Sequence, residues 1–478
     1  MSFRSLGRSS LVFVVASIAT FSSLTGAAFA APSSLAGVLF DRLPADNQLY
    51  PRGADNTAEI AVRGSVVAGR YSDVRLRVVA DGERLLERRA AIGSGLGRSE
   101  FAFSVDLPAG LVSYRFVVEL FDGRDWRVAA RSENVTVGDV YLVQGQSNAV
   151  ATDYHFEGLA NQNQRNWIRS FGSASTFPAI VENDLNWYVA DGLGSNGSGT
   201  IGAWALKTAR LLSELYQVPI AVLNGAVGGT AISYHLRDDA QPVDLETNYG
   251  RLLYRAEMSG VRQAARALIW YQGESDTNNI EPWARDFGEL YDDWQMDFPG
   301  LERFYVFQIR NSCGFATDDM QNTQRRLPEF YPLVSVMSTT AAPGHDGCHF
   351  FFAGYDELGD RLARVMARDL HGSEITENID PPAIDFASFS SPAQDEVTLV
   401  FEDPDDELFV DPGAEDDFYM SDGVDVVAAE VFGNTIVLTL AGPSNASEVE
   451  YRGHSFDGPW VTNARGVGAL TFAVPIER

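Results

Sequence analysis

One serine in this chain stands where a nucleophile could act. Ser147 lies in the stretch "GDVYLVQGQSNAVA", directly after a run of strand-forming residues and among small or polar neighbours. A serine hydroxyl becomes nucleophilic when a general base lies within hydrogen-bond reach and a third group orients that base. Taken alone, Ser147 fits an ordinary turn equally well, so other parts of the chain must supply these groups.

A base and its orienting carboxylate occur together in the stretch "HDGCHF". Asp346 and His349 are three residues apart, after an apolar run and before a helical pattern. One short loop can therefore supply the imidazole that takes the serine proton and the acceptor that fixes its tautomer. His345 lies nearby but lacks this spacing. The alternative interpretation is a capping Asp beside a surface His.

Two further stretches could stabilise an oxyanion. In "NGAVGGT", Gly228 and Gly229 can bring a backbone N–H close to a substrate oxygen because neither has a Cβ. In "WYQGESD", Gln272 could turn its side-chain amide toward the same oxygen. The residues leave open which glycine donates, and a Gly-Gly pair can also be a plain strand-to-helix turn.

Two acids follow Gln272 closely. Glu274 and Asp276 resemble a glycosidase pair, but positions on one loop are poorly placed to flank a glycosidic bond. We therefore expect Glu274 to be a buried hydrogen-bonding support.

The pattern of elements changes twice along the chain. Residues 35–137 and the segment after residue 379 show short period-two runs, which indicate β-sandwich domains. Between them, apolar runs alternate with helical patterns, for example Trp283, Phe287, Leu290 and Trp294. This alternation predicts an α/β fold with a parallel sheet, whose ligands bind at the carboxyl ends of the strands. The nucleophile, donor and base motifs all follow such strands.

We predict four segments from these changes. They are a signal peptide (1–30), an N-terminal β-sandwich domain (31–137), an α/β catalytic domain (138–378) and a C-terminal β domain (379–478).

The first residues predict export. Arg4 and Arg8 precede the apolar run "LVFVVASIAT", and "AFA" ends at Ala30 with the small residues of a cleavage site. An uncleaved anchor is the alternative, but the run is short for a bilayer of about 30 Å. We expect a secreted or periplasmic protein.

Composition narrows the partners and cofactors. A formal charge of −29 repels nucleic acid and anionic membranes, so we expect neither as a partner.

Cys313 and Cys348 can pair in an exported protein, the alternative being two buried thiols. Two cysteines cannot form a structural zinc site, and we expect no metal or cofactor. The acidic run between Glu402 and Asp425 lacks the spacing of a calcium loop, which favours a solvated surface. Composition does not determine the oligomeric state.

Together these blocks resemble a known superfamily. "GQSN", "GGT", "WYQGESD" and "DGCH" are similar to the blocks of SGNH (GDSL-type) hydrolases, and among them to carbohydrate esterases of the sialate O-acetylesterase and acetylxylan esterase kind. The flanking β domains resemble the layout of bacterial sialate O-acetylesterases. The resemblance implies a three-layer α/β fold, in which helices flank a parallel sheet. It further implies Ser147 as nucleophile, His349 as base and Asp346 as orienter. It also implies an oxyanion hole from the Ser147 N–H, one Gly of the 228–229 pair and Gln272. Asp276 departs from the sialate-type block, and Cys348 is not required by the pattern.

The expected substrate is an O-acetylated sugar, most of all O-acetylated sialic acid. Arg310 follows a strand and could pair with a sugar carboxylate, although an ordinary salt bridge is the alternative. Aromatic and imidazole side chains after the first two blocks could stack on a sugar ring: Tyr154, His155, Tyr234 and His235.

Three other functions are compatible with the sequence. They are an acetylxylan esterase on the same fold, a non-catalytic carbohydrate-binding protein, and a lipase, which the negative charge disfavours on anionic lipid surfaces.

Overall fold

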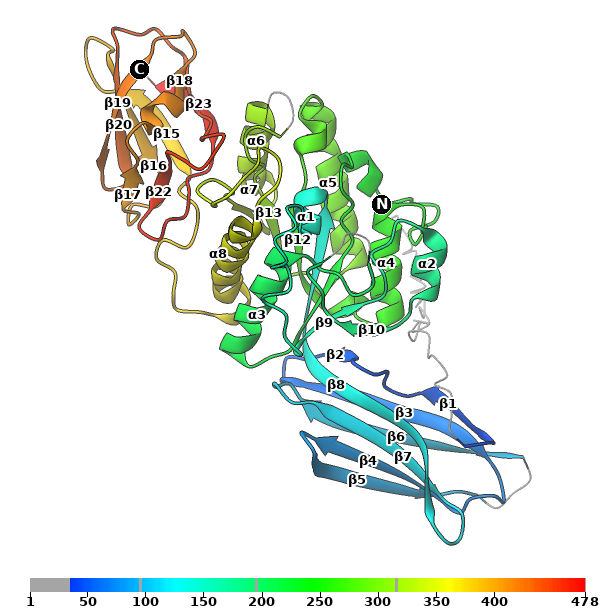
Figure 1. Cartoon of the computed structure of the whole chain (residues 1–478). Coiled ribbons are helices and arrows are strands. Elements are labelled where there is room, and N and C mark those ends of the chain that lie inside the picture. Colours follow the sequence, from blue (N-terminus) through cyan, green and yellow to red (C-terminus); the bar gives the residue numbers. More distant parts are fainter. Residues whose placement is uncertain (1–34, 94–96, 194–196, 314–316, 478) are drawn as a thin grey trace, which may run out of the picture.

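The computed structural model describes residues 35–93, 97–193, 197–313 and 317–477 of the chain. It shows a mixed α/β region between two β domains (Figure 1). The predicted signal peptide lies outside the described residues. Within the described ranges, no helix combines the length and apolar character needed to cross a bilayer.

Two antiparallel sheets form the N-terminal domain. Strands β1 (Val38–Arg42), β3 (Thr57–Val67) and β6 (Arg98–Pro108) make one sheet. The second contains β4 (Asp73–Ala80), β5 (Glu83–Ala91), β7 (Tyr114–Phe121) and the start of β8 (Trp126–Gly145). Alternate residues of β6 are buried, so the apolar face of this strand packs on the shared core while the polar face meets water. The short β2 (Leu49–Pro51) pairs in parallel with β8.

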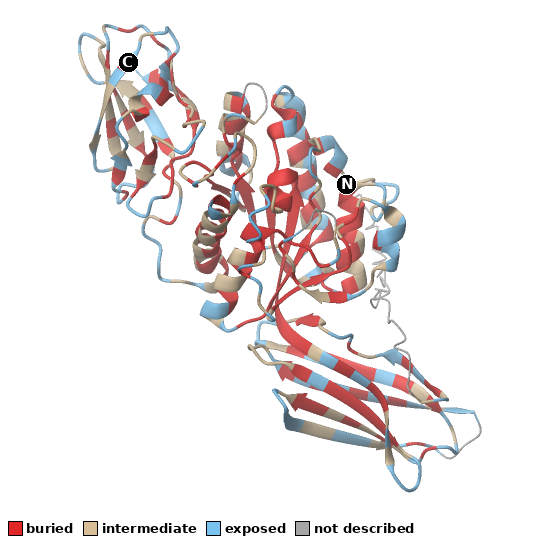
Figure 2. Ribbon diagram, viewed as in Figure 1, coloured by how far each residue is buried: buried red, intermediate tan, exposed pale blue. Residues whose placement is uncertain are grey.

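The central sheet is parallel except at one edge. Its order is β10-β9-β11-β8-β12-β13-β14, and only β10 (Trp187–Val189) runs antiparallel, to β9 (Ile168–Phe171). The other strands are β11 (Ile220–Asn224), β12 (Ala265–Tyr271), β13 (Arg303–Phe307) and β14 (Val334–Met337). Most of their residues are buried, as expected for strands covered on both faces (Figure 2).

Helices cover both sides of this sheet. Figure 1 shows α3 (Ala203–Tyr216) and α8 (Phe352–His371) on one side, and α4 (Asn248–Ser259) and α5 (Ile280–Asp297) on the other. The shorter helices are α1 (Ser147–Val150), α2 (Pro178–Asn183), α6 (Thr317–Arg325) and α7 (Leu327–Phe330), with 3-10 turns η1 (Ile232–His235), η2 (Arg262–Ala264) and η3 (Glu274–Asp276). The predicted face of α5 is confirmed, because Trp283, Phe287, Leu290 and Trp294 are all buried.

Strand β8 belongs to two domains. Its first half pairs with β7 of the N-terminal domain, and its second half lies between β11 and β12 of the central sheet. The predicted boundary after Val137 therefore falls inside a continuous strand. Beside this point Arg52 makes two hydrogen bonds of 2.7 Å to Asp139, which ties the two regions together.

The C-terminal domain is a seven-stranded sheet of order β18-β21-β23-β15-β16-β20-β19 beside a two-stranded one, β17-β22. Its strands are β15 (Ile384–Phe389), β16 (Glu396–Phe401), β17 (Leu408–Val410), β18 (Phe418–Met420), β19 (Val426–Phe432), β20 (Thr435–Leu440), β21 (Glu448–Tyr451), β22 (Val461–Asn463) and β23 (Phe472–Glu477), with the 3-10 turn η4 (Ala414–Asp417) before β18. It encloses an apolar core of its own.

Candidate active site

Ser147 stands at a sharp turn from strand to helix. Strand β8 ends at Gly145 and α1 begins at Ser147, which is 9% exposed. Gly145 has a φ of +136°, and a Cβ on it would lie 2.1 Å from the carbonyl oxygen of Tyr271. Only glycine fits this approach, and the Gln146 N–H then donates to the same carbonyl at 2.9 Å. The first N–H groups of a helix have no partner within the helix. In this turn the N–H groups of Ala149 and Val150 donate to the Gln146 carbonyl, whereas those of Ser147 and Asn148 make no hydrogen bond among the described residues.

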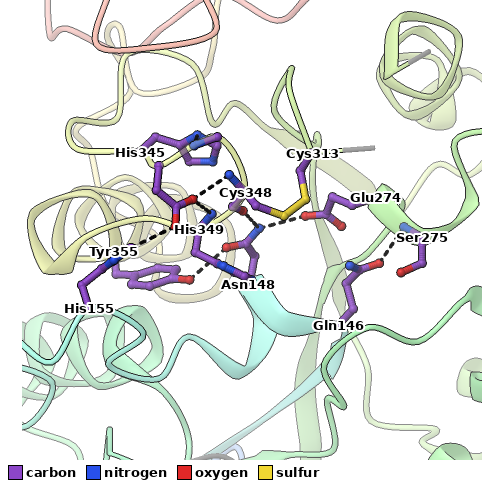
Figure 3. Close-up of a disulfide and its surroundings, with 12 residues drawn as sticks. Gln146, Asn148, His155, Glu274, Ser275, Cys313, His345, Cys348, His349 and Tyr355 are labelled. Carbon is purple, nitrogen blue, oxygen red and sulfur yellow. Dashed lines mark hydrogen bonds and ion pairs between the residues drawn. A yellow bond between two sulfur atoms is a disulfide. The ribbon is translucent and has the colours of Figure 1, made fainter. Parts of the chain in front are cut away.

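The side chain of Asn148 joins the sequence blocks. Its Nδ2 donates to Oε1 of Glu274 and to the carbonyl of Cys348, both at 2.9 Å (Figure 3). Its Oδ1 accepts from the Tyr355 hydroxyl of α8, also at 2.9 Å. The residue after Ser147 thus contacts the residue before His349. The motifs that follow β8, β12 and β14 therefore meet at one edge of the sheet.

Tyr154 links Ser147 to His349. Its hydroxyl donates to the carbonyl oxygen of Ser147 at 2.9 Å, and its ring stacks on the His349 imidazole with centroids 4.1 Å apart. Partial burial lowers the pKa of His349 below its ordinary value, although the Asp346 carboxylate acts in the opposite direction. A neutral imidazole, the form that accepts a proton, is therefore favoured.

Asp346 is shared between its own loop and a second histidine. Its Oδ1 accepts the N–H groups of Cys348 and His349, both at 2.7 Å, while Oδ2 lies 3.5 Å from Nε2 of His155. Partial burial raises the pKa of Asp346, but the two N–H groups outweigh this and leave the pKa below its ordinary value. Among the described residues, none hydrogen-bonds to the His349 ring or the Ser147 hydroxyl. Such bonds often tighten only when substrate binds.

The two glycines after β11 lie differently. A Cβ on Gly228 would be 3.7 Å from the Cβ of Ser147, whereas one on Gly229 would have no neighbour within 4 Å. Before them, the Val227 N–H donates to Gly145 at 3.0 Å, which holds this loop against the turn. Gly228 is therefore the member of the pair that lies beside the serine.

Gln272 belongs to a buried network beneath the site. Its Nε2 donates to Asp276 and makes longer bonds of 3.3 Å to Gln146 and to the Thr230 carbonyl, and its Oε1 accepts from Trp283 at 2.7 Å. The side chain has no exposed surface. In this state its amide hydrogens are engaged within the protein, so its use as an oxyanion donor stays a proposal.

Glu274 is buried beside Asn148. Burial raises the pKa of its carboxyl, and the hydrogen bond from Asn148 opposes this only in part. Its Oε1 accepts that bond, while Oε2 has no hydrogen-bond partner among the described groups.

Of the residues considered for sugar contact, Arg310 and His235 are inaccessible, whereas Tyr234 is exposed. Arg310 is 2% exposed; it donates to the carbonyls of Ala342 and Phe456, and its guanidinium lies 4.8 Å from the Trp460 ring. His235 has no exposed surface, and burial lowers its pKa to about 3. We correct the expectation of substrate contact for both: Arg310 joins the catalytic region to the C-terminal domain, and His235 is a core residue.

Tyr154 and His155 contact the candidate catalytic residues directly, a positioning role that was not predicted from the sequence. Tyr154 and His155 had been considered as sugar-stacking residues, yet their rings face His349 and Asp346 respectively. No sequence spacing indicates this, because the contacts depend on how the loop after β8 folds back. Asn148, in contrast, lies inside the "GQSN" block and could have been singled out from the resemblance.

The predicted disulfide is confirmed. Cys313 and Cys348 are bonded across a sequence separation of 35, joining the loop after β13 to the loop of Asp346 and His349 (Figure 3). Across the described ranges, no group of three or more His, Cys, Asp or Glu side chains is arranged to bind a metal.

The fold and this site together define a class of protein. Residues 137–368 match the family of carbohydrate esterases described as sialic acid-specific acetylesterases. The matched residues make up just under half of the chain, and they identify it as a carbohydrate O-acetylesterase. No curated protein matches the chain in sequence.

Solved structures extend the similarity beyond the central region. A carbohydrate acetylesterase from Xanthomonas citri is 19% identical, covers 90% of this chain and 98% of its own, and has a TM-score of 0.61. At this identity the match shows a shared fold. A protein from Arabidopsis thaliana is 20% identical and covers 48% of this chain and 97% of its own. Its TM-score of 0.37 is too low to support an argument.

Proposed function

We propose that this protein is an exported serine esterase that removes O-acetyl groups from sugars. Ser147 is the nucleophile, His349 the general base and Asp346 its orienter, on an SGNH-type three-layer domain. The observation that best supports this proposal is the pair of contacts made by Tyr154, whose hydroxyl bonds to Ser147 while its ring stacks on His349. The two reacting side chains come from loops about two hundred positions apart, and this contact holds them to a common residue.

The reaction is acyl transfer to water in two steps. The His349 imidazole takes the Ser147 proton as Oγ attacks the acetyl carbonyl, and then gives that proton to the departing sugar oxygen. In the second step the imidazole activates a water molecule that attacks the acetyl-serine and releases acetate. Asp346 favours the imidazolium formed in both steps through its negative charge.

The oxyanion formed on the acetyl group needs preorganised donors. We assign the N–H groups of Ser147 and Gly228 to this role, because Gly228 lies against Ser147. A rotation of the Gln272 amide away from Asp276 would supply a third donor. Removing one such donor typically costs about 3–4 kcal/mol in transition-state stabilisation.

The sugar is the open part of this proposal. The family description favours O-acetylated sialic acid. A neutral substrate such as acetylated xylan is the second candidate, because the buried Arg310 cannot read a sugar carboxylate and the chain is strongly acidic. Acetate release from both substrates, measured side by side, distinguishes the two.

Export is also part of the proposal. The predicted signal peptide would deliver the chain to an oxidising compartment, where the Cys313–Cys348 disulfide persists. N-terminal sequencing of the exported protein should begin at Ala31.

The test of the catalytic assignment is Ser147→Ala. We expect the rate of acetate release to fall by at least about 10³-fold, since members of a triad act as a unit. Ser104→Ala, on the exposed face of β6, is the matched control and should keep the wild-type rate. Wild-type activity in purified Ser147→Ala would exclude this serine as the nucleophile.

A further inference from the structure

The loop that follows α1 is fixed at both ends. The Asp153 carboxylate accepts the N–H groups of Glu157 and Gly158 at 2.9 and 2.7 Å, which closes the segment 153–158 on itself. The Glu157 carboxylate in turn accepts the N–H of Phe352, the first residue of α8. These bonds hold a short loop at the edge of the sheet where the esterase motifs meet.

The inner side of this loop contacts the triad. Tyr154 bonds to Ser147 and stacks on His349, and His155 lies beside Asp346. The His155 ring also stacks on Phe351, with centroids 3.8 Å apart. The residue that comes next in the chain, Phe156, therefore directly follows two residues that contact these groups.

Phe156 is unusual in its backbone and in its exposure. Its φ is +57°, in the left-handed region that bulky side chains rarely adopt. Its side chain is 94% exposed, more than any other large apolar residue that the structure describes. The backbone conformation carries a strain cost and the exposed ring gains nothing from burial, and residues kept in such a conformation cluster at ligand-binding and active sites.

A second aromatic surface lies next to it. Phe351 is 37% exposed, and its ring stacks on His155, whose imidazole lies beside Asp346. Because the loop backbone is anchored on both sides of Phe156, the backbone loses little freedom when a ligand covers the ring. A rigid, uncharged aromatic ring suits the apolar C–H face of a pyranose, which offers neither charge nor strong donors.

We propose that Phe156 is a sugar-stacking residue of this esterase, covering one face of a pyranose ring of the acetylated substrate. This inference rests on the proposed function, because it assigns part of the sugar-binding site of the same enzyme. It predicts that Phe156 contributes to the binding of the sugar and much less to the chemistry of the acetyl group.

The experiment compares two kinds of acetate ester. For wild type and variants, kcat/KM is measured on an acetylated sugar, either acetylated xylo-oligosaccharide or O-acetylated sialic acid, and on ethyl acetate, which has no ring to stack. In Phe156→Ala the ratio of kcat/KM on the sugar ester to kcat/KM on ethyl acetate should fall roughly three- to tenfold. The fall should come mainly from a higher KM for the sugar ester. Phe156→Trp keeps an aromatic ring and should stay within about twofold of wild type.

Two further variants separate stacking from folding. Phe432→Ala removes another exposed phenylalanine, on β19 of the C-terminal domain, and should leave the ratio unchanged. Phe156→Asn should lower the ratio as Phe156→Ala does while keeping a Tm equal to or above that of wild type, because Asn tolerates a positive φ.

The outcomes are distinct. If wild type hydrolyses the sugar ester and Phe156→Ala keeps the wild-type ratio, the stacking role is overturned while the proposed esterase function stands. If wild type hydrolyses ethyl acetate but neither sugar ester, the proposed carbohydrate function fails, and the stacking role fails with it.

Discussion

Single side chains connect parts of this enzyme that are distant in the sequence. Asn148 bonds to Glu274, Cys348 and Tyr355, and Tyr154 contacts both Ser147 and His349. Neither residue is expected to exchange protons with substrate. Both position the groups that we propose do so.

The two functions of Tyr154 can be separated by substitution. Tyr154→Phe keeps the stack on His349 and loses only the bond to Ser147, so kcat should fall by about two- to tenfold. Tyr154→Leu also loses the stack and should lose more, with little change in KM. Steady-state kinetics on an acetate ester measures both, and equal rates for Tyr154→Leu and wild type would contradict the positioning role.

The rate should depend on pH through His349. Burial lowers the pKa of His349 below 6.5, and this imidazole must be neutral to accept a proton. The value of kcat/KM should therefore rise with pH through a pKa below 6.5 and be level near neutrality.

Two substitutions should move this acidic limb in opposite directions. The Asp346 carboxylate raises the pKa of His349, so the residual activity of Asp346→Asn should show a limb at lower pH. His155 lowers the pKa of His349, so His155→Gln should move the limb to higher pH. If the acidic limbs of the two variants shift in the same direction, or do not shift, the electrostatic roles assigned to Asp346 and His155 are contradicted.

At the scale of elements, loops at the carboxyl ends of parallel strands carry the site. The turn after β8 places Ser147, the loop after β11 places Gly228, and the loop after β14 carries Asp346 and His349. The last of these is fastened by the disulfide to the loop after β13. The site is thus braced between neighbouring loops.

Removing the disulfide should affect both stability and rate. The double variant Cys313→Ser/Cys348→Ser should lose about 3–4 kcal/mol of unfolding free energy, given a sequence separation of 35. It should also lower kcat, since Cys348 adjoins His349. Urea unfolding and initial rates test this, with the wild type under a reducing agent as a parallel sample. A variant that is less stable yet fully active would show that the disulfide does not position the base.

At the scale of the whole molecule, the C-terminal domain holds the catalytic loop. The Asp457 carboxylate accepts the N–H of Gly344 at 2.7 Å, and Arg310 bonds to carbonyls on both sides of the junction. Gln308 adds two bonds to the backbone of Thr471. The loop of Asp346 is therefore supported by a domain that carries none of the proposed catalytic residues.

This support predicts an effect at a distance. Asp457→Ala should lower kcat by a few-fold, because a bond that holds the start of the catalytic loop is worth about 1 kcal/mol. Asp416→Ala removes an exposed acid of the same domain and should leave kcat unchanged. Equal rates for the two variants would show that the C-terminal domain acts independently of the site.

Much of the fold follows from local patterns in the sequence. Period-two runs indicated the flanking β domains, and the spacing of Trp283, Phe287, Leu290 and Trp294 predicted the buried face of α5. These predictions succeed because side-chain direction repeats with the period of the element. The sequence did not predict that β8 continues from the N-terminal domain into the central sheet. Both halves have the pattern of a strand, and they differ only in the elements that pack around them.

The sequence by itself determined which residues could do the chemistry, because nucleophile, base and glycine motifs each occupy a few consecutive positions after a strand. It also indicated the disulfide, through two cysteines in a chain whose first residues predict export. Only the tertiary structure decided that Gly228 rather than Gly229 adjoins Ser147, that Arg310 is buried at a domain junction, and that Tyr154 and His155 face the triad. Each of these depends on contacts between segments far apart in the chain, which no local spacing specifies.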